Sequence, residues 1–141
     1  MDKKRMLIID DDRSILDSFK LIFERKGYLV DTAETGNEAI EKVRCNYYNL
    51  ALIDLGLPDM DGTALLSEFR ELNPEMKKIV ITGLSTRENA ISCLNLGADA
   101  YLEKPVTPGK LLEFVAAKLA EQEHEIAYHE DTVNKLLQSR R

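Results

Sequence analysis

The sequence predicts an α/β fold built on a doubly wound parallel sheet. Five short apolar runs alternate along the chain with five stretches of helical periodicity. Strict alternation of this kind is typical of a parallel sheet with right-handed crossovers. The run Leu50–Ile53 is apolar at every position, as expected for a strand that is buried on both faces. Because about 120 residues for five such units leaves only short loops, we expect a flavodoxin-like sheet of strand order 2-1-3-4-5.

The first half of the chain provides three strands and two helices. We expect strands over Arg5–Ile9, Tyr28–Thr32 and Leu50–Ile53, and helices over Ser14–Lys26 and Gly36–Cys45. In the first helix, Ile15, Phe19, Ile22 and Phe23 recur at three- and four-residue spacing, which predicts an inward-facing stripe. Gly27 stands where a glycine commonly ends a helix.

The second half continues the alternation. We expect helices over Thr63–Leu72 and Thr86–Leu96, strands over Lys78–Thr82 and Asp99–Leu102, and a long helix that begins near Pro108. Asn73-Pro74, Gly97 and Lys104-Pro105 supply the interruptions between these elements.

The last segment is longer than the predicted domain requires. No Pro or Gly interrupts Lys110–Arg141, and a helix of about 30 residues is about 45 Å long. Leu112, Leu119, Ile126 and Val133 recur every seven residues, but Gln122 and His129 occupy the alternate core positions, so the coiled-coil signal is weak. We therefore expect a domain over 1–120 and a helical extension or linker over 121–141, with three alternatives for the latter: a linker to an output domain, a dimerising helix or a frayed end.

Composition narrows the class of protein. A length of 141 residues fits one domain with a core, and 44% hydrophobic residues fit a globular protein. The net charge of −6 argues against direct nucleic acid binding, which needs clustered Lys and Arg. No apolar run approaches the roughly 20 residues that span a bilayer, so no membrane segment is expected. Cys45 and Cys93 stand alone, and we expect a cytoplasmic protein without a disulfide framework.

Polar residues follow four of the predicted strands where each strand ends. Residues 10–12 are three consecutive acids after the first strand, Asp54 follows the third, and Thr82 and Lys104 end the fourth and fifth. In the predicted order, the first and third strands are neighbours at the switch point, where ligands bind in such sheets. We therefore expect Asp10, Asp11 and Asp54 to share a crevice with Thr82 and Lys104, and Asp12 to cap the first helix.

Crowded carboxylates of this kind favour binding of a hard cation. Two of them about 4 Å apart repel by about 4 kcal/mol at an effective dielectric of 20. Either one retains a proton or a divalent cation binds, and an all-oxygen site favours Mg²⁺, Mn²⁺ or Ca²⁺. A carboxylate can also attack phosphorus and form an aspartyl phosphate. Mg²⁺, the Lys104 ammonium and the Thr82 hydroxyl could then each neutralise one oxygen of the transferred group.

Four segments carry a family resemblance. LIIDDD, DLGLPDMDG, VITG and GADAYLEKP resemble the signature segments of the receiver domain of two-component response regulators, the CheY-like superfamily, over roughly residues 4 to 120. The resemblance implies a phosphoprotein in a phosphorelay rather than an enzyme. Asp54 would accept the phosphoryl group from a sensor histidine kinase or a phosphotransfer protein, and the protein would assist its own phosphorylation and dephosphorylation.

The resemblance also implies roles around Asp54. Asp11 and Asp54 would bind Mg²⁺ directly, Asp10 largely through water, and the Gly56 backbone carbonyl would be a further ligand. Lys104 would contact the phosphoryl oxygens, through a loop with a cis Lys104-Pro105 peptide.

A switch follows from the same resemblance. Thr82 would be the switch hydroxyl and Tyr101 the switch aromatic, and they would relay phosphorylation to the face formed by the fourth helix, fifth strand and fifth helix. That face would control a partner or an output domain. A homodimer could form through it or through the C-terminal helix.

Other functions compete with this one. A haloacid-dehalogenase-like phosphatase would use Asp10 as nucleophile, with Asp12, Thr82 and Lys104 in matching order, but it leaves Asp54 without a role. A nucleotide- or flavin-binding module would need a glycine-rich turn, and no GxGxxG motif follows the first strand. A degenerate receiver used only for docking would be expected to lack some residues of the phosphorylation site, and all of them are present here.

Overall fold

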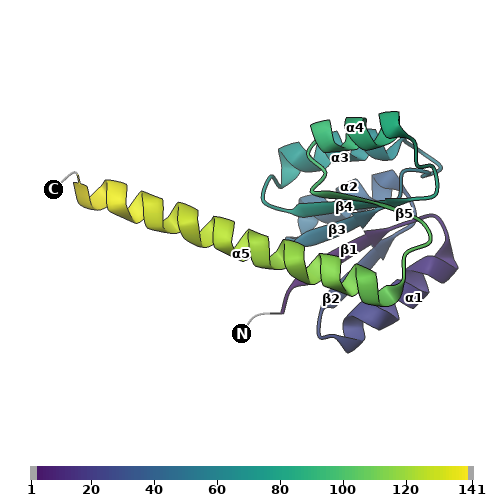
Figure 1. Cartoon of the computed structure of the whole chain (residues 1–141), viewed down its shortest axis with the longest axis horizontal. Helices are drawn as coiled ribbons and strands as arrows, with labels where there is room; N and C mark the ends of the chain where they lie inside the picture. Colours follow the sequence, from purple (N-terminus) through teal and green to yellow (C-terminus); the bar gives the residue numbers. More distant parts are fainter. Residues whose placement is uncertain (1–2, 140–141) are drawn as a thin grey trace.

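The computed structural model describes residues 3–139 and contains one five-stranded parallel sheet (Figure 1). Its strand order is β2-β1-β3-β4-β5, as the sequence predicts. The strands are β1 (Arg5–Ile9), β2 (Leu29–Ala33), β3 (Leu50–Ile53), β4 (Lys77–Thr82) and β5 (Ala100–Glu103). All four neighbouring pairs run parallel.

Five helices cover the two faces of the sheet. They are α1 (Arg13–Arg25), α2 (Gly36–Cys45), α3 (Gly62–Leu72), α4 (Arg87–Asn95) and α5 (Pro108–Ser139). α1 and α5 lie on one face, and α2, α3 and α4 lie on the other (Figure 1). Alternate residues of β1 divide between the two cores: Met6 and Ile8 pack under α1 and α5, whereas Leu7 and Ile9 pack under α2 and α3. Strands buried on both faces explain the uninterrupted apolar runs.

The register of the sheet sets the position of the acids. Ile9 pairs with Ile53, so that Asp10 and Asp54 follow at the same edge. The Asp54 amide donates to the Ile9 carbonyl at 3.0 Å, which extends the ladder by one residue. Neighbouring strands therefore place both carboxylates at their carboxyl ends.

Side-chain caps begin all five helices, including α5, where Thr107 accepts the Lys110 amide at 3.3 Å. Asp12 accepts hydrogen bonds from the backbone of Ser14 and Ile15 at the start of α1, as predicted. Thr35, Asp61 and Thr86 cap α2, α3 and α4 in the same way. Each cap satisfies an N–H group that would otherwise lack a partner in the first turn.

The inward stripe of α1 differs in one respect from the predicted one. Phe23 is buried as expected, but Leu16, which the stripe omits, is buried too, while Ile15, Phe19 and Ile22 are only partly covered. α1 is therefore rotated so that Leu16 faces the sheet. In this orientation the helix packs on the face of β1 that carries Met6 and Ile8 and also contacts α5. Strand and helix boundaries otherwise agree with the prediction to within one or two residues.

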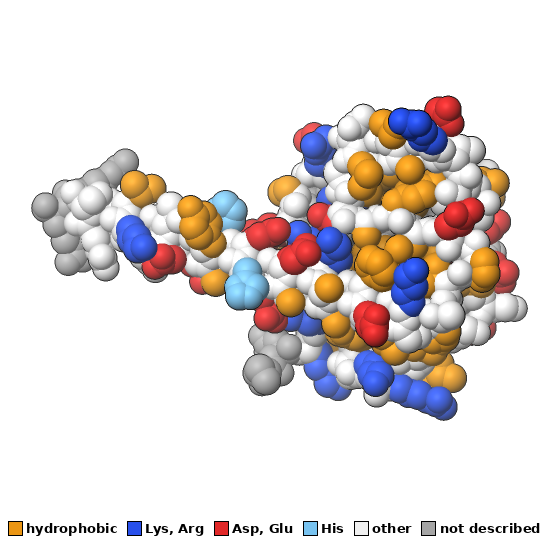
Figure 2. All heavy atoms as spheres, viewed as in Figure 1, with side chains coloured by type: hydrophobic (Ala, Val, Ile, Leu, Met, Phe, Trp, Pro, Cys, Tyr) orange, Lys and Arg blue, Asp and Glu red, His pale blue; other side chains and the backbone are white. Residues whose placement is uncertain are grey.

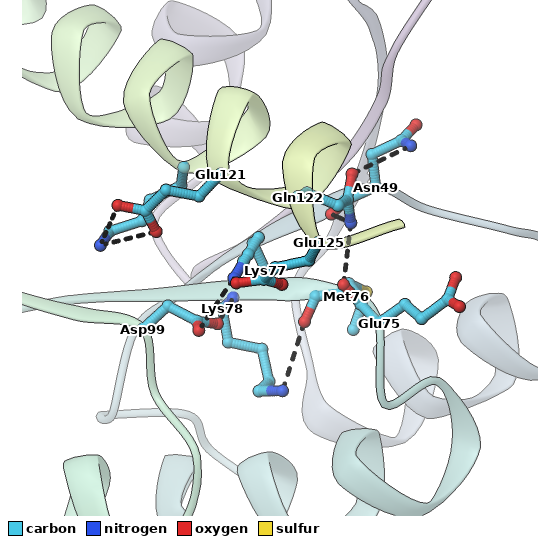
Figure 3. A network of polar contacts seen from close by, with 10 residues as sticks. Asn49, Glu75, Met76, Lys77, Lys78, Asp99, Glu121, Gln122 and Glu125 are labelled. Carbon is cyan, nitrogen blue, oxygen red and sulfur yellow. Dashed lines mark hydrogen bonds and ion pairs between the residues drawn. The ribbon is translucent and has the colours of Figure 1, made fainter. Parts of the chain in front are cut away.

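α5 continues well past the sheet (Figure 1). Leu111, Val115 and Leu119 are buried against the domain. Gln122 is also buried, and its amide group donates to the backbone carbonyls of Asn49 and Glu75 at 2.8 Å each. Figure 3 shows these contacts beside the pair of Lys77 with Glu125. Helix α5 therefore contacts the amino-terminal edge of the sheet as far as Glu125.

Beyond Ile126, which is partly covered, α5 projects away from the sheet (Figure 1). Tyr128, Val133, Leu136 and Leu137 are exposed there, and so is His129; His124, just before Glu125, is exposed as well (Figure 2). Residues 140 and 141, which the sequence places in the helical extension, lie outside the described residues, as do residues 1 and 2. Within 3–139, no helix combines the length and apolar character of a membrane span.

Candidate functional site

Three carboxylates converge at the carboxyl edge of the sheet. Asp10, Asp11 and Asp54 each offer an oxygen, and these oxygens all lie within 4.8 Å of one another. Asp10 and Asp54 are buried, whereas Asp11 is exposed. This juxtaposition agrees with the predicted crevice. Three hard oxygen donors at this spacing fit a divalent cation such as Mg²⁺, which keeps water in its remaining positions.

Lys104 is the cation of the site. Its ammonium nitrogen lies 3.0 Å from an Asp10 oxygen and 3.5 Å from an Asp54 oxygen. The Lys104 backbone amide donates to the Thr82 carbonyl at 2.9 Å, and the Lys104-Pro105 peptide is cis, as the resemblance implies. β4 and the loop after β5 therefore hold the ammonium over the two buried acids. One lysine leaves the cluster of three carboxylates with an excess of negative charge.

The pKa values of Asp54 and Lys104 reflect that excess. Burial, and then the charge of Asp10, raise the pKa of Asp54 above its ordinary value, although Lys104 and the Gly56 amide work in the opposite direction. Burial lowers the pKa of Lys104, but the hydrogen bond and charge of Asp10, with the charge of Asp54, outweigh burial and raise it overall. Lys104 is thus held in its charged form, while the charged form of Asp54 is disfavoured.

The loop after β3 closes the site from one side. The Gly56 amide lies 3.4 Å from an Asp54 oxygen, and Gly56 forms an isolated antiparallel bridge with Asp61. A side chain at Gly56 would begin 3.9 Å from the other Asp54 oxygen and 3.4 Å from Leu84. Gly62 permits an even closer approach, because a Cβ there would lie 2.7 Å from the Leu55 backbone. These glycines allow the loop to fold tightly against Asp54.

Thr82 ends β4, and Tyr101 lies on the neighbouring β5 opposite Val80, two residues before the partner of Thr82. Thr82 is fully buried, and its hydroxyl oxygen accepts the Leu84 amide at 2.9 Å. Tyr101 is partly buried, and its hydroxyl has no hydrogen-bond partner within residues 3–139. The two residues do not touch the acids through any hydrogen bond. A buried hydroxyl without a partner is uncommon in folded proteins.

One contributor to this edge has no counterpart in the sequence prediction. Asp59, in the loop after β3, accepts the backbone amides of Gly36 and Asn37 at 2.8 Å each. These two bonds lower the pKa of Asp59 and tie the loop to the start of α2. The contact joins residues 22 and 23 positions apart, so no local pattern in the sequence reveals it.

Comparison with known families agrees with this geometry. The model of the response regulator receiver domain matches residues 6–116. The chain therefore belongs to the response regulator receiver domain family, the class of protein that its sheet order and clustered acids define.

Solved structures and curated proteins provide particular relatives. A CheY-like receiver domain protein from Methanospirillum hungatei JF-1 superposes with a TM-score of 0.87 at 52% identity, over 88% of this chain and 99% of that one. A response regulator from Burkholderia pseudomallei, solved with a phosphorylated aspartic acid, calcium ion and citrate, has a TM-score of 0.78 at 28% identity, over 90% and 75%.

The curated relatives are longer proteins. The transcriptional regulatory protein PmrA of Pectobacterium parmentieri is 38% identical over 101 residues, which are 72% of this chain and 46% of that protein. DltR of Streptococcus agalactiae is 34% identical over 77% of this chain and 48% of that protein. The chain thus spans about half the length of these relatives.

Proposed function

We propose that Asp54 is the phosphoacceptor of this receiver domain and takes its phosphoryl group from a histidine kinase or a phosphotransfer protein. The observation that carries the proposal is the convergence of Asp10, Asp11, Asp54 and Lys104 at the carboxyl edge of neighbouring strands. Of the buried acids, Asp54 lies beside the tight Gly56 loop and has the weaker contact with Lys104. A carboxylate so placed keeps an oxygen available to attack phosphorus.

Magnesium is the proposed cofactor. Asp11 and Asp54 would hold it directly, Asp10 through water, and the Gly56 carbonyl would be a fourth ligand. When bound, Mg²⁺ supplies positive charge that offsets the acids and the incoming phosphoryl oxygens. The calcium ion named with the Burkholderia regulator supports a hard divalent cation in such proteins.

The remaining residues of the site would stabilise the transferred group. The Lys104 ammonium, already 3.5 Å from Asp54, would turn from Asp10 towards a phosphoryl oxygen. The Thr82 hydroxyl would give up its contact with the Leu84 amide and donate to another oxygen. Asp10 would then balance the charge of the cation. In this role the protein is a phosphoacceptor that assists its own phosphorylation and hydrolysis and is not a conventional enzyme.

The switch would start at Thr82 and pass to Tyr101. Moving the Thr82 hydroxyl releases the Leu84 amide and frees the loop that leads to α4. The Tyr101 hydroxyl has no partner to lose among residues 3–139, so the ring can move at little cost. The face of α4, β5 and α5 would thereby change its affinity for a partner, a second copy or an output domain. We place this activity in the cytoplasm, with residues 1–120 as the receiver and 121–141 as extension or linker.

Acetyl phosphate tests the proposal against the phosphatase alternative. With Mg²⁺, the wild-type protein should accumulate a stable fraction of phosphorylated chain, and Asp54→Asn should accumulate none. Asp10→Asn should keep a reduced capacity, because Asp10 would act on the cation. If Asp10→Asn abolished phosphorylation while Asp54→Asn retained it, the nucleophile would be Asp10 and the phosphatase hypothesis would replace ours.

A further inference from the structure

Two consecutive lysines begin β4 at the amino-terminal edge of the sheet, opposite Asp54. Lys77 is 6% exposed and Lys78 is 4% exposed. Since neighbouring side chains of a strand point to opposite faces, the two ammonium groups diverge (Figure 3). Buried lysines are rare unless a carboxylate accompanies them. How each of these two is compensated therefore determines what the edge of the sheet can bind.

Lys77 is fully compensated. Its ammonium lies 2.9 Å from a Glu125 oxygen on α5 and 3.6 Å from an Asp99 oxygen. Asp99 uses its other oxygen to accept the Lys78 backbone amide at 2.8 Å. Both acids of this group are thus already engaged by partners other than the Lys78 side chain.

Lys78 is not compensated. Its ammonium donates to one acceptor, the Met76 carbonyl at 3.3 Å, although it carries three protons to donate. Within residues 3–139, neither Lys78 nor Arg70 on α3 forms a salt bridge. Burial lowers the pKa of Lys78; Asp99 raises it, while Arg70 and Lys77 lower it further. The Lys78 ammonium therefore has donor capacity that no carboxylate among residues 3–139 uses, although Glu75, Asp99 and Glu125 lie around the cavity that it lines.

The two unpaired cations line one hollow. A cavity of about 310 Å³ is bounded by Arg70, Lys78, Gly97 and Asp99 together with residues 74–77 and Glu125. A Cβ placed on Gly97 would lie 3.8 Å from the Arg70 Nε atom and 3.9 Å from the Lys78 ammonium nitrogen. Both nitrogens therefore approach one point beside Gly97, where the chain has no side chain.

We propose that this hollow binds a small oxyanion, held between the Lys78 ammonium and the Arg70 guanidinium beside Gly97. The anion would supply the acceptors that the buried ammonium lacks, and Arg70 would contribute its planar pair of N–H groups. The site lies at the opposite edge of the sheet from Asp54 and does not depend on its phosphorylation.

Nuclear magnetic resonance titration with inorganic phosphate tests the site. The full chain is kept in a chelator at constant ionic strength, with chloride exchanged for phosphate. The backbone signals of Lys78, Gly97 and Asp99 should shift saturably. Lys78→Met and Arg70→Gln should each weaken binding about tenfold or more, because each removes a charge-assisted hydrogen bond. Lys110→Met, which removes an exposed lysine at the start of α5, should leave the affinity for phosphate unchanged.

Both variants are expected to fold, so that a loss of binding reports on the site itself. Lys78→Met keeps the length of the buried stem and removes a poorly solvated charge, so it should fold, and Arg70→Gln alters an exposed residue. Non-saturable shifts, or equal affinity in wild type and both variants, would overturn the proposal. A parallel titration with acetate identifies the chemical class of the natural ligand. Tighter binding of phosphate indicates a phosphate-bearing ligand, and tighter binding of acetate indicates a carboxylate.

Discussion

Replacing Gln122 by alanine should destabilise the domain by about 2 kcal/mol, although the residue lies outside the predicted receiver. Its amide group makes two bonds of 2.8 Å to backbone carbonyls, and its oxygen accepts the Asn49 side chain at 3.3 Å. The Asn49 carbonyl keeps the Lys77 amide as a second donor, so its loss is modest. The Glu75 carbonyl and the Asn49 amide group lose partners outright. Two such losses, at about 1 kcal/mol each, give the estimate.

Urea denaturation of the full chain measures this change. Glu123→Ala is the matched control, one residue further along α5; its side chain is exposed and pairs with Lys4 at 3.0 Å. An exposed ion pair contributes at most about 0.5–1 kcal/mol. A loss for Gln122→Ala no larger than that of the control would refute the reasoning, because Gln122 would then not hold α5 to the edge of the sheet.

Three further predictions concern the site and its loops. Without divalent metal, Asp54→Asn should raise the Tm by several degrees at pH 7, because an acid whose pKa is raised on folding lowers stability as pH rises from its ordinary pKa to the raised one. Mg²⁺ should cancel this gain in Tm. If the variant showed no gain in chelator, the three carboxylates would not repel one another as we infer. Asp59→Ala should destabilise the protein most above the ordinary aspartate pKa of about 3.9. The effect should shrink progressively below that pH, because stability from a lowered pKa is lost as pH falls through the folded-state value. An effect in urea at pH 3 as large as at pH 7 would argue against this contact of Asp59 with the start of α2. Tyr101→Phe should stabilise the protein by up to about 1 kcal/mol in thermal unfolding, because the hydroxyl that it removes is buried without a hydrogen-bond partner in residues 3–139. A clear loss of stability would mean that the hydroxyl does form a hydrogen bond.

The sequence predicted the sheet and the acidic cluster for the same physical reason. Strands such as Leu50–Ile53 are apolar throughout, and the residue that ends each run lies at a shared edge once the strand order is known. Asp10, Asp11 and Asp54 therefore came together from topology alone. The cap formed by Asp12 followed from its position just before a helix.

Contacts that depend on tertiary packing were not accessible in this way. Gln122 was visible only as a polar residue at an apolar position of the heptad, and its partners lie 47 and 73 positions away. Lys77 and Lys78 look like solvated residues that flank a strand, yet both are buried. Asp99 and Glu125 of α5 pair with Lys77, whereas Lys78 points to the opposite face of the sheet. Asp59 pairs across the loop with α2 for a similar reason.

The most direct measurement is the position of the phosphoryl group after treatment with acetyl phosphate and Mg²⁺. Borohydride converts a phosphorylated aspartate to homoserine, and trypsin separates residues 6–13, which contain Asp10 and Asp11, from residues 45–70, which contain Asp54. Our account predicts homoserine at position 54 and none in the first peptide. Homoserine at position 10, or at Asp59 or Asp61 in place of Asp54, would contradict it.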